Sequence, residues 1–143
     1  MVNVSVKGKI NASADDVWKT FSSFRDVEKY FPLIKSSTVQ GFGLGTKRTC
    51  TIGTHDNGDT KIEEEITKFD NDSKSLTYSI ISSPLPFQNY LGTVKVIDLG
   101  DNTCEFECIG SFEPKGISED EASKQLKDVY LVLIDGLNKF LSS

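Results

Sequence analysis

Apolar and polar side chains alternate at the start of the chain. Val2, Val4, Val6 and Ile10 are separated by two positions or a multiple of two. Successive side chains of a β-strand point to opposite faces, so residues with this spacing share one face. The pattern therefore predicts a first strand over residues 2–10 with one apolar face.

Helical spacing begins directly after this strand. Ser13 is a favoured residue at a helix N-terminus, and Asp15 and Asp16 suit the positive end of the helix dipole. The apolar stripe of this predicted helix consists of Val17, Trp18, Phe21 and Phe24. A second short helix is predicted over residues 25–30, and it should stop before Pro32 because the residue that precedes a proline disfavours the helical conformation.

The alternating pattern returns after these helices and continues over residues 34–112. Residues typical of turns interrupt it at 41–45, 55–59, 70–73, 82–86 and 99–102. These turns divide the segment into six predicted strands, which short connections would arrange as an antiparallel sheet. His55, the only histidine of the chain, falls in the second turn and is expected to be an exposed turn residue.

A long amphipathic helix is predicted over residues 118–141. Ser118 and Glu121 form the capping-box pattern at its start. Its apolar stripe consists of Ala122, Leu126, Val129, Leu133, Leu137 and Phe140. We therefore expect an α+β fold in a single domain of residues 1–143, with a curved seven-stranded antiparallel sheet wrapped around a long C-terminal helix and two short helices after the first strand.

The composition supports one globular domain and narrows the choice of partners. The chain has 143 residues, of which 37% are hydrophobic and 26% are charged, as is ordinary for a folded domain. Its formal net charge is -5 and it has no run of Lys or Arg, which argues against binding to nucleic acid or to anionic lipid surfaces. No segment has the pattern of a signal peptide or is apolar for long enough to span a bilayer, so we predict a cytoplasmic protein without membrane insertion.

The cysteines and the glycine-rich loop do not indicate a metal or cofactor site. Cys50, Cys104 and Cys108 are an odd number without C-x-x-C spacing or neighbouring histidines, so buried free thiols are expected. The GFGLG loop at 41–45 precedes a strand, whereas a phosphate-binding loop precedes a helix. We therefore predict no metal and no cofactor, and the sequence does not indicate an oligomeric state.

Four polar residues interrupt the apolar faces of the predicted strands. Alternation places Arg48, Glu64, Tyr78 and Tyr90 among apolar neighbours, and Lys35 is a further candidate in a more weakly patterned strand. An unpaired carboxylate in an apolar interior is costly, so Glu64 is expected to pair with Arg48, and two tyrosine hydroxyls could satisfy its remaining lone pairs. Such a pair could serve only to hold the strands in register. Alternatively, the converging polar groups could line a ligand pocket.

Five segments and the terminal helix resemble the START-like (SRPBCC) superfamily, whose members have the helix-grip fold. These segments are 10–24, 31–48, 64–70, 76–96 and 106–114. Their order is similar to that of the polyketide cyclase/dehydrase-like branch, and the resemblance covers essentially the whole chain. It implies a hydrophobic cavity between sheet and long helix that holds a small apolar molecule, with three loops at its mouth: 41–45, 54–59 and 82–87.

The resemblance also implies roles for particular residues. Lys35 resembles the lysine that meets a ligand carboxylate in hormone receptors of this superfamily, and the four polar residues above are similar in type and spacing to the polar set of the lachrymatory-factor synthases. The candidate ligand-binding residues are Lys35, Arg48, Glu64, Tyr78, Tyr90, Phe87, Phe106 and Leu133, and the candidate catalytic residues are Glu64, Arg48 and Tyr90. The receptor gate motif and a signal peptide are absent from this sequence, so neither hormone reception nor a periplasmic role in methanol oxidation is expected.

Two functions are consistent with this interpretation. A carrier or sensor would bind a small apolar molecule with a carboxylate or carbonyl end, which Arg48 and Lys35 would contact. A cyclase, isomerase or lyase would use Glu64 as a general acid or base, with Arg48 and a tyrosine stabilising a developing oxyanion. A protein-interaction module is less favoured, because the outward positions of the predicted strands form no apolar patch.

Overall fold

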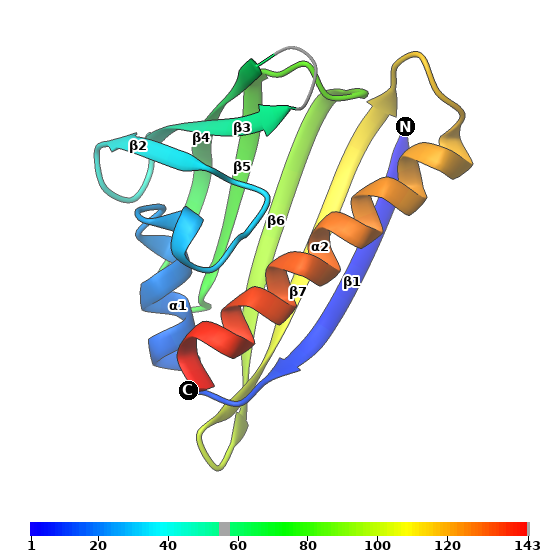
Figure 1. Cartoon of the computed structure of the whole chain (residues 1–143). Helices are drawn as coiled ribbons and strands as arrows, with labels where there is room; N and C mark the ends of the chain where they lie inside the picture. Colours follow the sequence, from blue (N-terminus) through cyan, green and yellow to red (C-terminus); the bar gives the residue numbers. More distant parts are fainter. Residues whose placement is uncertain (55–57, 143) are drawn as a thin grey trace.

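The computed structural model describes residues 1–54 and 58–142, and its elements follow the predicted order (Figure 1). The strands are β1 (Val2–Ile10), β2 (Ser36–Gln40), β3 (Lys47–Thr54), β4 (Gly58–Asp70), β5 (Ser75–Ser82), β6 (Phe87–Gly100) and β7 (Thr103–Pro114). The helical elements are α1 (Ala14–Ser22), the 3-10 turn η1 (Val27–Lys29) and α2 (Glu119–Ser142). His55, for which the sequence predicts an exposed turn, lies outside the described residues.

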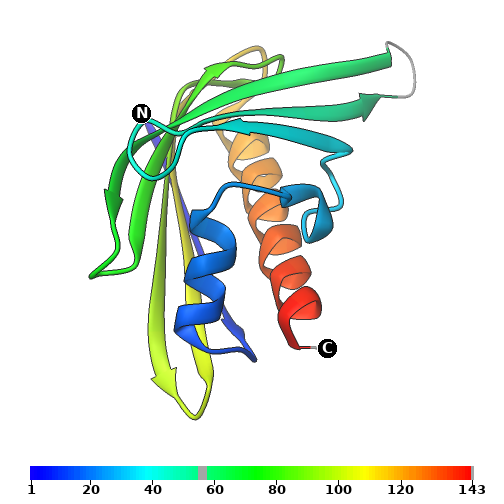
Figure 2. The same ribbon diagram turned by 90° about the vertical axis from the view of Figure 1, so that its left-hand side faces the viewer.

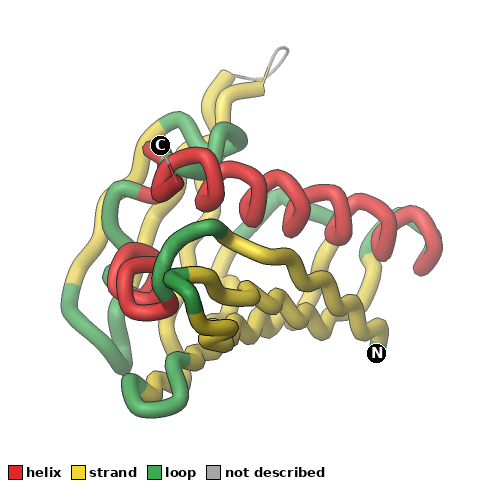
Figure 3. The backbone as a smooth tube through the Cα atoms, turned by 90° about the horizontal axis from the view of Figure 1, so that it is seen from below, coloured by secondary structure: helices red, strands yellow, loops and turns green. Residues whose placement is uncertain are grey.

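The strands of the described residues form one seven-stranded sheet, in the order β1-β7-β6-β5-β4-β3-β2. Every neighbouring pair is antiparallel. The sheet curves around α2, which crosses one of its faces, as Figures 1 and 3 show. The helices α1 and η1 lie beside the C-terminal half of α2 (Figure 2). The predicted α+β architecture is thereby confirmed.

Side-chain caps begin both α-helices where the sequence predicts them. The Ser13 hydroxyl accepts a hydrogen bond from the Asp16 backbone N–H at 3.1 Å. The Ser118 hydroxyl accepts one from the Glu121 backbone N–H at 3.2 Å. Each cap satisfies a backbone donor that has no partner within the first turn of its helix.

The second predicted helix is shorter than residues 25–30. Phe24 and Asp26 have φ angles of 62° and 57°, in the left-handed region that a right-handed helix does not use. The chain therefore leaves the helical conformation after α1, and only Val27–Lys29 form a helical turn.

The buried face of α2 is wider than the predicted stripe. Its buried side chains are Ala122, Leu126, Tyr130, Leu133, Ile134 and Leu137. Tyr130 and Ile134 are additional, whereas Val129 is half-buried and Phe140 is 44% exposed. The predicted stripe is a single line of residues along the helix. The curved sheet also covers the neighbouring line that contains Tyr130 and Ile134. Gly8 of β1 makes this possible near Ile134, because a Cβ at Gly8 would lie 2.9 Å from Ile134 Cγ2.

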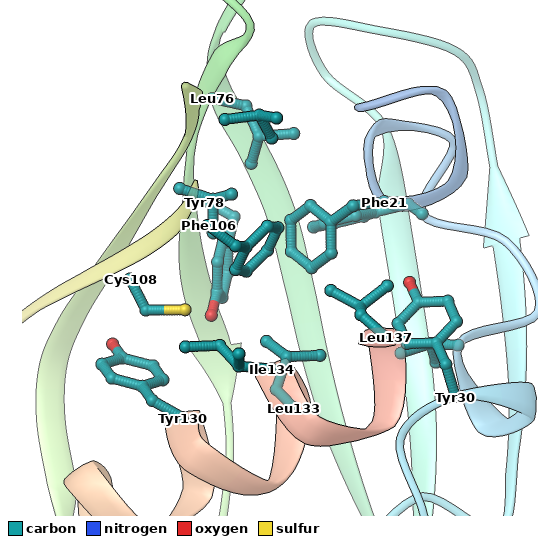
Figure 4. Close-up of a cluster of buried hydrophobic side chains, with 14 of the residues drawn as sticks. Phe21, Tyr30, Leu76, Tyr78, Phe106, Cys108, Tyr130, Leu133, Ile134 and Leu137 are labelled. Atoms are coloured by element: carbon teal, nitrogen blue, oxygen red, sulfur yellow. The ribbon is translucent and has the colours of Figure 1, made fainter. Parts of the chain in front are cut away.

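Aromatic rings fill the core between the sheet and α1. Phe21 of α1 packs edge-on against Phe106 of β7, with ring centroids 5.2 Å apart (Figure 4). Phe24 is also fully buried, and its ring lies edge-on to that of Phe21. This packing holds α1 against the inner face of the sheet, near the end of α2.

Candidate functional site

Arg48 and Glu64 form a buried ion pair on the inner face of the sheet. They are directly opposite each other on β3 and β4, and Arg48 Nε donates a hydrogen bond to Glu64 Oε1 at 2.9 Å. The two residues are only 6% and 7% exposed. The pairing predicted from alternation is confirmed.

The strand β5 is irregular opposite Glu64. In the pairing of β4 with β5, Glu63 is opposite Ser82, whereas Glu64 is opposite Ile80. Ile81 is left between these two pairs and is 53% exposed. This is a β-bulge, a feature that bends a strand and redirects side chains. Glu64 itself keeps the alternation of β4, where Ile62, Glu64 and Ile66 are all buried on the inner face.

The surroundings of Arg48 hold its guanidinium in one place. Its Cζ lies 3.8 Å from the centroid of the Phe24 ring, and its Nη1 donates to the Phe24 carbonyl oxygen at 3.4 Å. Burial alone would lower the pKa of Arg48, but the Glu64 carboxylate opposes this effect and the pKa is raised above its ordinary value. Arg48 therefore remains a cation in the interior.

Glu64 Oε1 has a second donor in the thiol of Cys50. The Cys50 sulfur lies 3.4 Å from Glu64 Oε1. Burial raises the pKa of the Cys50 thiol to about 12, so the thiol is protonated near neutral pH and acts as a donor. The same carboxylate oxygen thus accepts hydrogen bonds from both Arg48 and Cys50.

Each member of the ion pair keeps one polar atom that no described residue engages. Glu64 Oε2 accepts no hydrogen bond from the described part of the chain, and Arg48 Nη2 donates none to it. The Tyr30 hydroxyl is the only fully buried side-chain nitrogen or oxygen atom among the described residues that lacks a hydrogen-bond partner. Oε2 and Nη2 are therefore open to accessible space, and both residues line the pocket described below.

Three tyrosine hydroxyls on the same inner side form a hydrogen-bonded chain. The hydroxyls of Tyr78 and Tyr90 lie 3.1 Å apart, and the Tyr90 hydroxyl is also hydrogen-bonded to that of Tyr130 on α2. Burial raises the pKa of all three side chains, which keeps them neutral. The expectation that tyrosines complete the hydrogen bonds of Glu64 is wrong, because these hydroxyls bind one another.

Two glycines leave room for the tyrosine chain. Gly92 of β6 and Gly110 of β7 are opposite each other in the sheet. A Cβ at Gly92 would lie 2.6 Å from Tyr78 Cζ, and a Cβ at Gly110 would overlap the Tyr130 hydroxyl. Because glycine has no side chain, the two rings can lie close to the sheet backbone. Figure 4 shows Tyr78 and Tyr130 pointing into the space between sheet and α2.

The ion pair and the tyrosine chain both line a pocket of about 260 Å³ between the sheet and α2. Six of the candidate residues from the sequence line it: Arg48, Glu64, Tyr78, Phe87, Tyr90 and Leu133. The other thirteen of the nineteen lining residues were not among these candidates, and they include Phe21, Cys50, Ile62, Leu126, Val129 and Tyr130. Most of the remaining lining is aliphatic or aromatic. Tyr130 could have been found from its spacing of four residues after Leu126.

Two candidate ligand-binding residues lie elsewhere. Lys35 Nζ forms an ion pair with the Asp59 carboxylate at 3.2 Å, and the Lys35 side chain is 62% exposed. Lys35 directly precedes the edge strand β2, where the sheet does not enclose the side chain. Phe106 is fully buried against Phe21 in the core and does not line the pocket.

The three loops implied to gate the cavity contribute unequally to its lining. The segment 82–87 supplies Leu85 and Phe87. The segment 41–45 supplies none of the lining, and its Phe42 is 84% exposed beneath the Arg25 guanidinium. In the loop 54–59, residues 55–57 lie outside the described part of the chain. On the side of η1, residues 31–34 complete the lining with Phe31, Leu33 and Ile34.

The described residues contain no group of three or more His, Cys, Asp or Glu side chains that could hold a metal ion. All three cysteines are buried and none is in a disulfide, as the sequence predicts. Within the same residues, no helix combines the length and the apolar composition needed to cross a membrane.

The fold and the pocket define a helix-grip protein with a mainly apolar interior site. The chain matches the family described as "Polyketide cyclase / dehydrase and lipid transport" over residues 1–139, and it belongs to this family. This confirms the superfamily indicated by the sequence motifs.

Solved structures share the fold over nearly the whole chain. XoxI from Bacillus cereus is 27% identical, with a TM-score of 0.87, and the match covers 100% of this chain and 97% of that one. An uncharacterised protein from Bacillus thuringiensis is 26% identical, with a TM-score of 0.86 and coverage of 99% and 100%. Norcoclaurine synthase from Thalictrum flavum shares the fold at 18% identity, with a TM-score of 0.72 and coverage of 99% and 94%. No functionally curated protein matches the sequence.

Proposed function

We propose that this protein binds a small, mainly apolar molecule between the sheet and α2, as a carrier or sensor. The observation that supports this most is the apolar pocket of about 260 Å³, which Arg48 and Glu64 line while Glu64 Oε2 and Arg48 Nη2 remain without a partner among the described residues. A well-formed apolar pocket with a few convergent polar groups is the usual form of a small-molecule site. The family description, which includes lipid transport, is consistent with the proposal.

The pocket volume limits the size of the ligand. An engineered apolar cavity of about 150 Å³ accommodates benzene. The pocket here, at about 260 Å³, is larger by roughly the space of a second ring. A molecule with one or two rings, or an aliphatic chain of similar volume, is therefore the expected occupant.

Native mass spectrometry of protein purified from its own host tests the proposal. We expect a bound small molecule that is lost in Leu133→Phe, because Leu133 lines the pocket and a larger side chain there would fill it. Leu131→Phe is the matched control, since Leu131 lies on the same helix but is 52% exposed. Equal retention of the molecule by both variants would place the ligand elsewhere. A wild-type protein that neither carries a ligand nor binds small aromatic probes would contradict the proposal.

A second candidate function is proton-transfer catalysis, as in a cyclase, isomerase or lyase. It is favoured by one observation: Glu64 keeps a carboxylate oxygen open to the pocket, with Arg48 beside it and tyrosine hydroxyls on the same lining. The fold also occurs in an enzyme, norcoclaurine synthase. Chemical conversion of the co-purified ligand by the wild type, absent in Glu64→Gln while binding persists, would support this role. Conversion that survives in Glu64→Gln would exclude Glu64 as the proton-transfer residue, and a wild type that converts nothing would exclude the catalytic function.

A further inference from the structure

The lining of the pocket is electrically balanced before any ligand enters. Among its lining residues within the described chain, the charged side chains are Arg48 and Glu64, and they are paired at 2.9 Å. Lys35, the cation that could have met a ligand carboxylate, is engaged outside the pocket by Asp59. A ligand carboxylate would therefore bring an uncompensated negative charge into an apolar interior, which is strongly unfavourable.

The tyrosine chain has one hydroxyl proton more than it can use internally. Tyr78, Tyr90 and Tyr130 have three hydroxyl protons, but only two hydrogen bonds join them. In the described residues no further acceptor is hydrogen-bonded to these hydroxyls. The spare donor is on one of the three hydroxyls, and all three tyrosines line the pocket. Arg48 Nη2 is another open donor.

We propose that the pocket selects uncharged ligands with a carbonyl oxygen and discriminates against carboxylates of the same shape. This inference depends on the binding function proposed above and specifies its ligand class. The carbonyl accepts a hydrogen bond from the tyrosine chain or from Arg48, while the Arg48–Glu64 pair remains intact. A carboxylate offers the same acceptor atoms but disturbs the charge balance of the lining.

Three probes of similar shape separate the two proposals. The first is the neutral ketone 2-acetylnaphthalene, and the second is its carboxylate counterpart, 2-naphthoate. The third is naphthalene, which has no polar group. Dissociation constants are measured by calorimetric titration of the wild type. We expect the ketone to bind most tightly and the carboxylate to bind at least about tenfold more weakly than the ketone, because burying an uncompensated ion is costly.

The outcomes are distinguishable. If 2-naphthoate binds as tightly as the ketone, the charge selection is refuted while the binding function stands. If naphthalene binds as tightly as the ketone, the carbonyl contact is refuted. If none of the three binds, this inference fails, and the proposed function fails with it when native mass spectrometry also finds no bound molecule.

A charge change in the protein provides an independent readout. Glu64→Gln leaves Arg48 as an uncompensated cation, so the preference between ketone and carboxylate should reverse. Glu63→Gln is the matched control, because Glu63 is exposed on the same strand and its replacement should leave the preference unchanged. An unchanged preference in folded Glu64→Gln would refute the charge argument. If that variant does not fold, the wild-type comparison decides.

Discussion

Removing one partner of the buried Arg48–Glu64 pair should strongly destabilise the protein. Both residues are less than a tenth exposed, at 6% and 7%, and Glu64 is the only carboxylate on the pocket lining of the described chain. In Glu64→Gln, the Arg48 cation remains buried and loses its charged hydrogen bond. Deleting one member of such a pair typically costs about 3–5 kcal/mol of unfolding free energy. For a domain of this length, the corresponding loss is roughly 10 °C in melting temperature.

The matched control lies on the next cross-strand pair. Lys47 and Glu65 are opposite each other on β3 and β4, on the outer face of the sheet, and Lys47 is exposed. Glu65→Gln makes the same chemical change in a solvated setting, where surface substitutions usually alter stability by less than about 0.5 kcal/mol. Urea denaturation of both variants, monitored by Trp18 fluorescence, gives the two free energies. A loss below about 1 kcal/mol in Glu64→Gln would refute the reasoning, because it would mean that Arg48 is well solvated without its partner.

Replacing both partners separates the structural from the ligand-related role of the pair. In Arg48→Met with Glu64→Leu, no charge is left buried, and such hydrophobic replacements range from neutral to about 4 kcal/mol stabilising. We expect stability at or above that of the wild type, together with loss of the discrimination between ketone and carboxylate probes. A stable double variant that still discriminates would show that the pair does not recognise the ligand.

Two further predictions concern close packing and burial. Gly136→Ala should destabilise the protein by about 1–3 kcal/mol in urea denaturation, although alanine is normally the better helix residue, because the new Cβ would overlap the Tyr30 backbone carbonyl. A gain in stability would contradict this contact between α2 and Tyr30, the residue that follows η1. All four tyrosines are buried with raised pKa values, so alkaline titration should show no tyrosinate absorbance until the protein unfolds. Since the unfolded tyrosines ionise near their ordinary pKa of about 10, stability should fall as the pH rises above that value, and tyrosinate signal from still-folded protein would refute the burial.

The fold could be predicted because each element has its own periodicity. The spacing of Val2, Val4 and Val6 allows only a strand with one apolar face, and the caps at Ser13 and Ser118 mark the helix starts. Alternation also identified the inward direction of Arg48 and Glu64, because a strand residue has only two faces to choose from. The charge cost of burial then predicted their pairing.

The remaining errors come from contacts that a local pattern does not contain. The tyrosine chain depends on where α2 crosses the sheet, and this crossing brings Tyr130 to Tyr90 across 40 residues of sequence. Lys35 shares the alternation of the strand predicted there, but it directly precedes the edge strand β2, where alternation does not imply burial. Phe106 does point inward, but α1 covers it with Phe21 and so removes it from the pocket.

Under the proposed function, the buried pair combines two tasks that the sequence presented as alternatives. If β3 slipped by two residues against β4, each side chain would keep its face, but Arg48 would be opposite Ile62 or Ile66 and both charges would be buried unpaired. The contact between Arg48 Nε and Glu64 Oε1 therefore penalises the wrong register. This task occupies only one nitrogen and one oxygen. Glu64 Oε2 and Arg48 Nη2 are not needed for it, and these are the atoms of the pair that remain open to the pocket. Strand register and the proposed ligand recognition are thus divided between different atoms of the same two side chains.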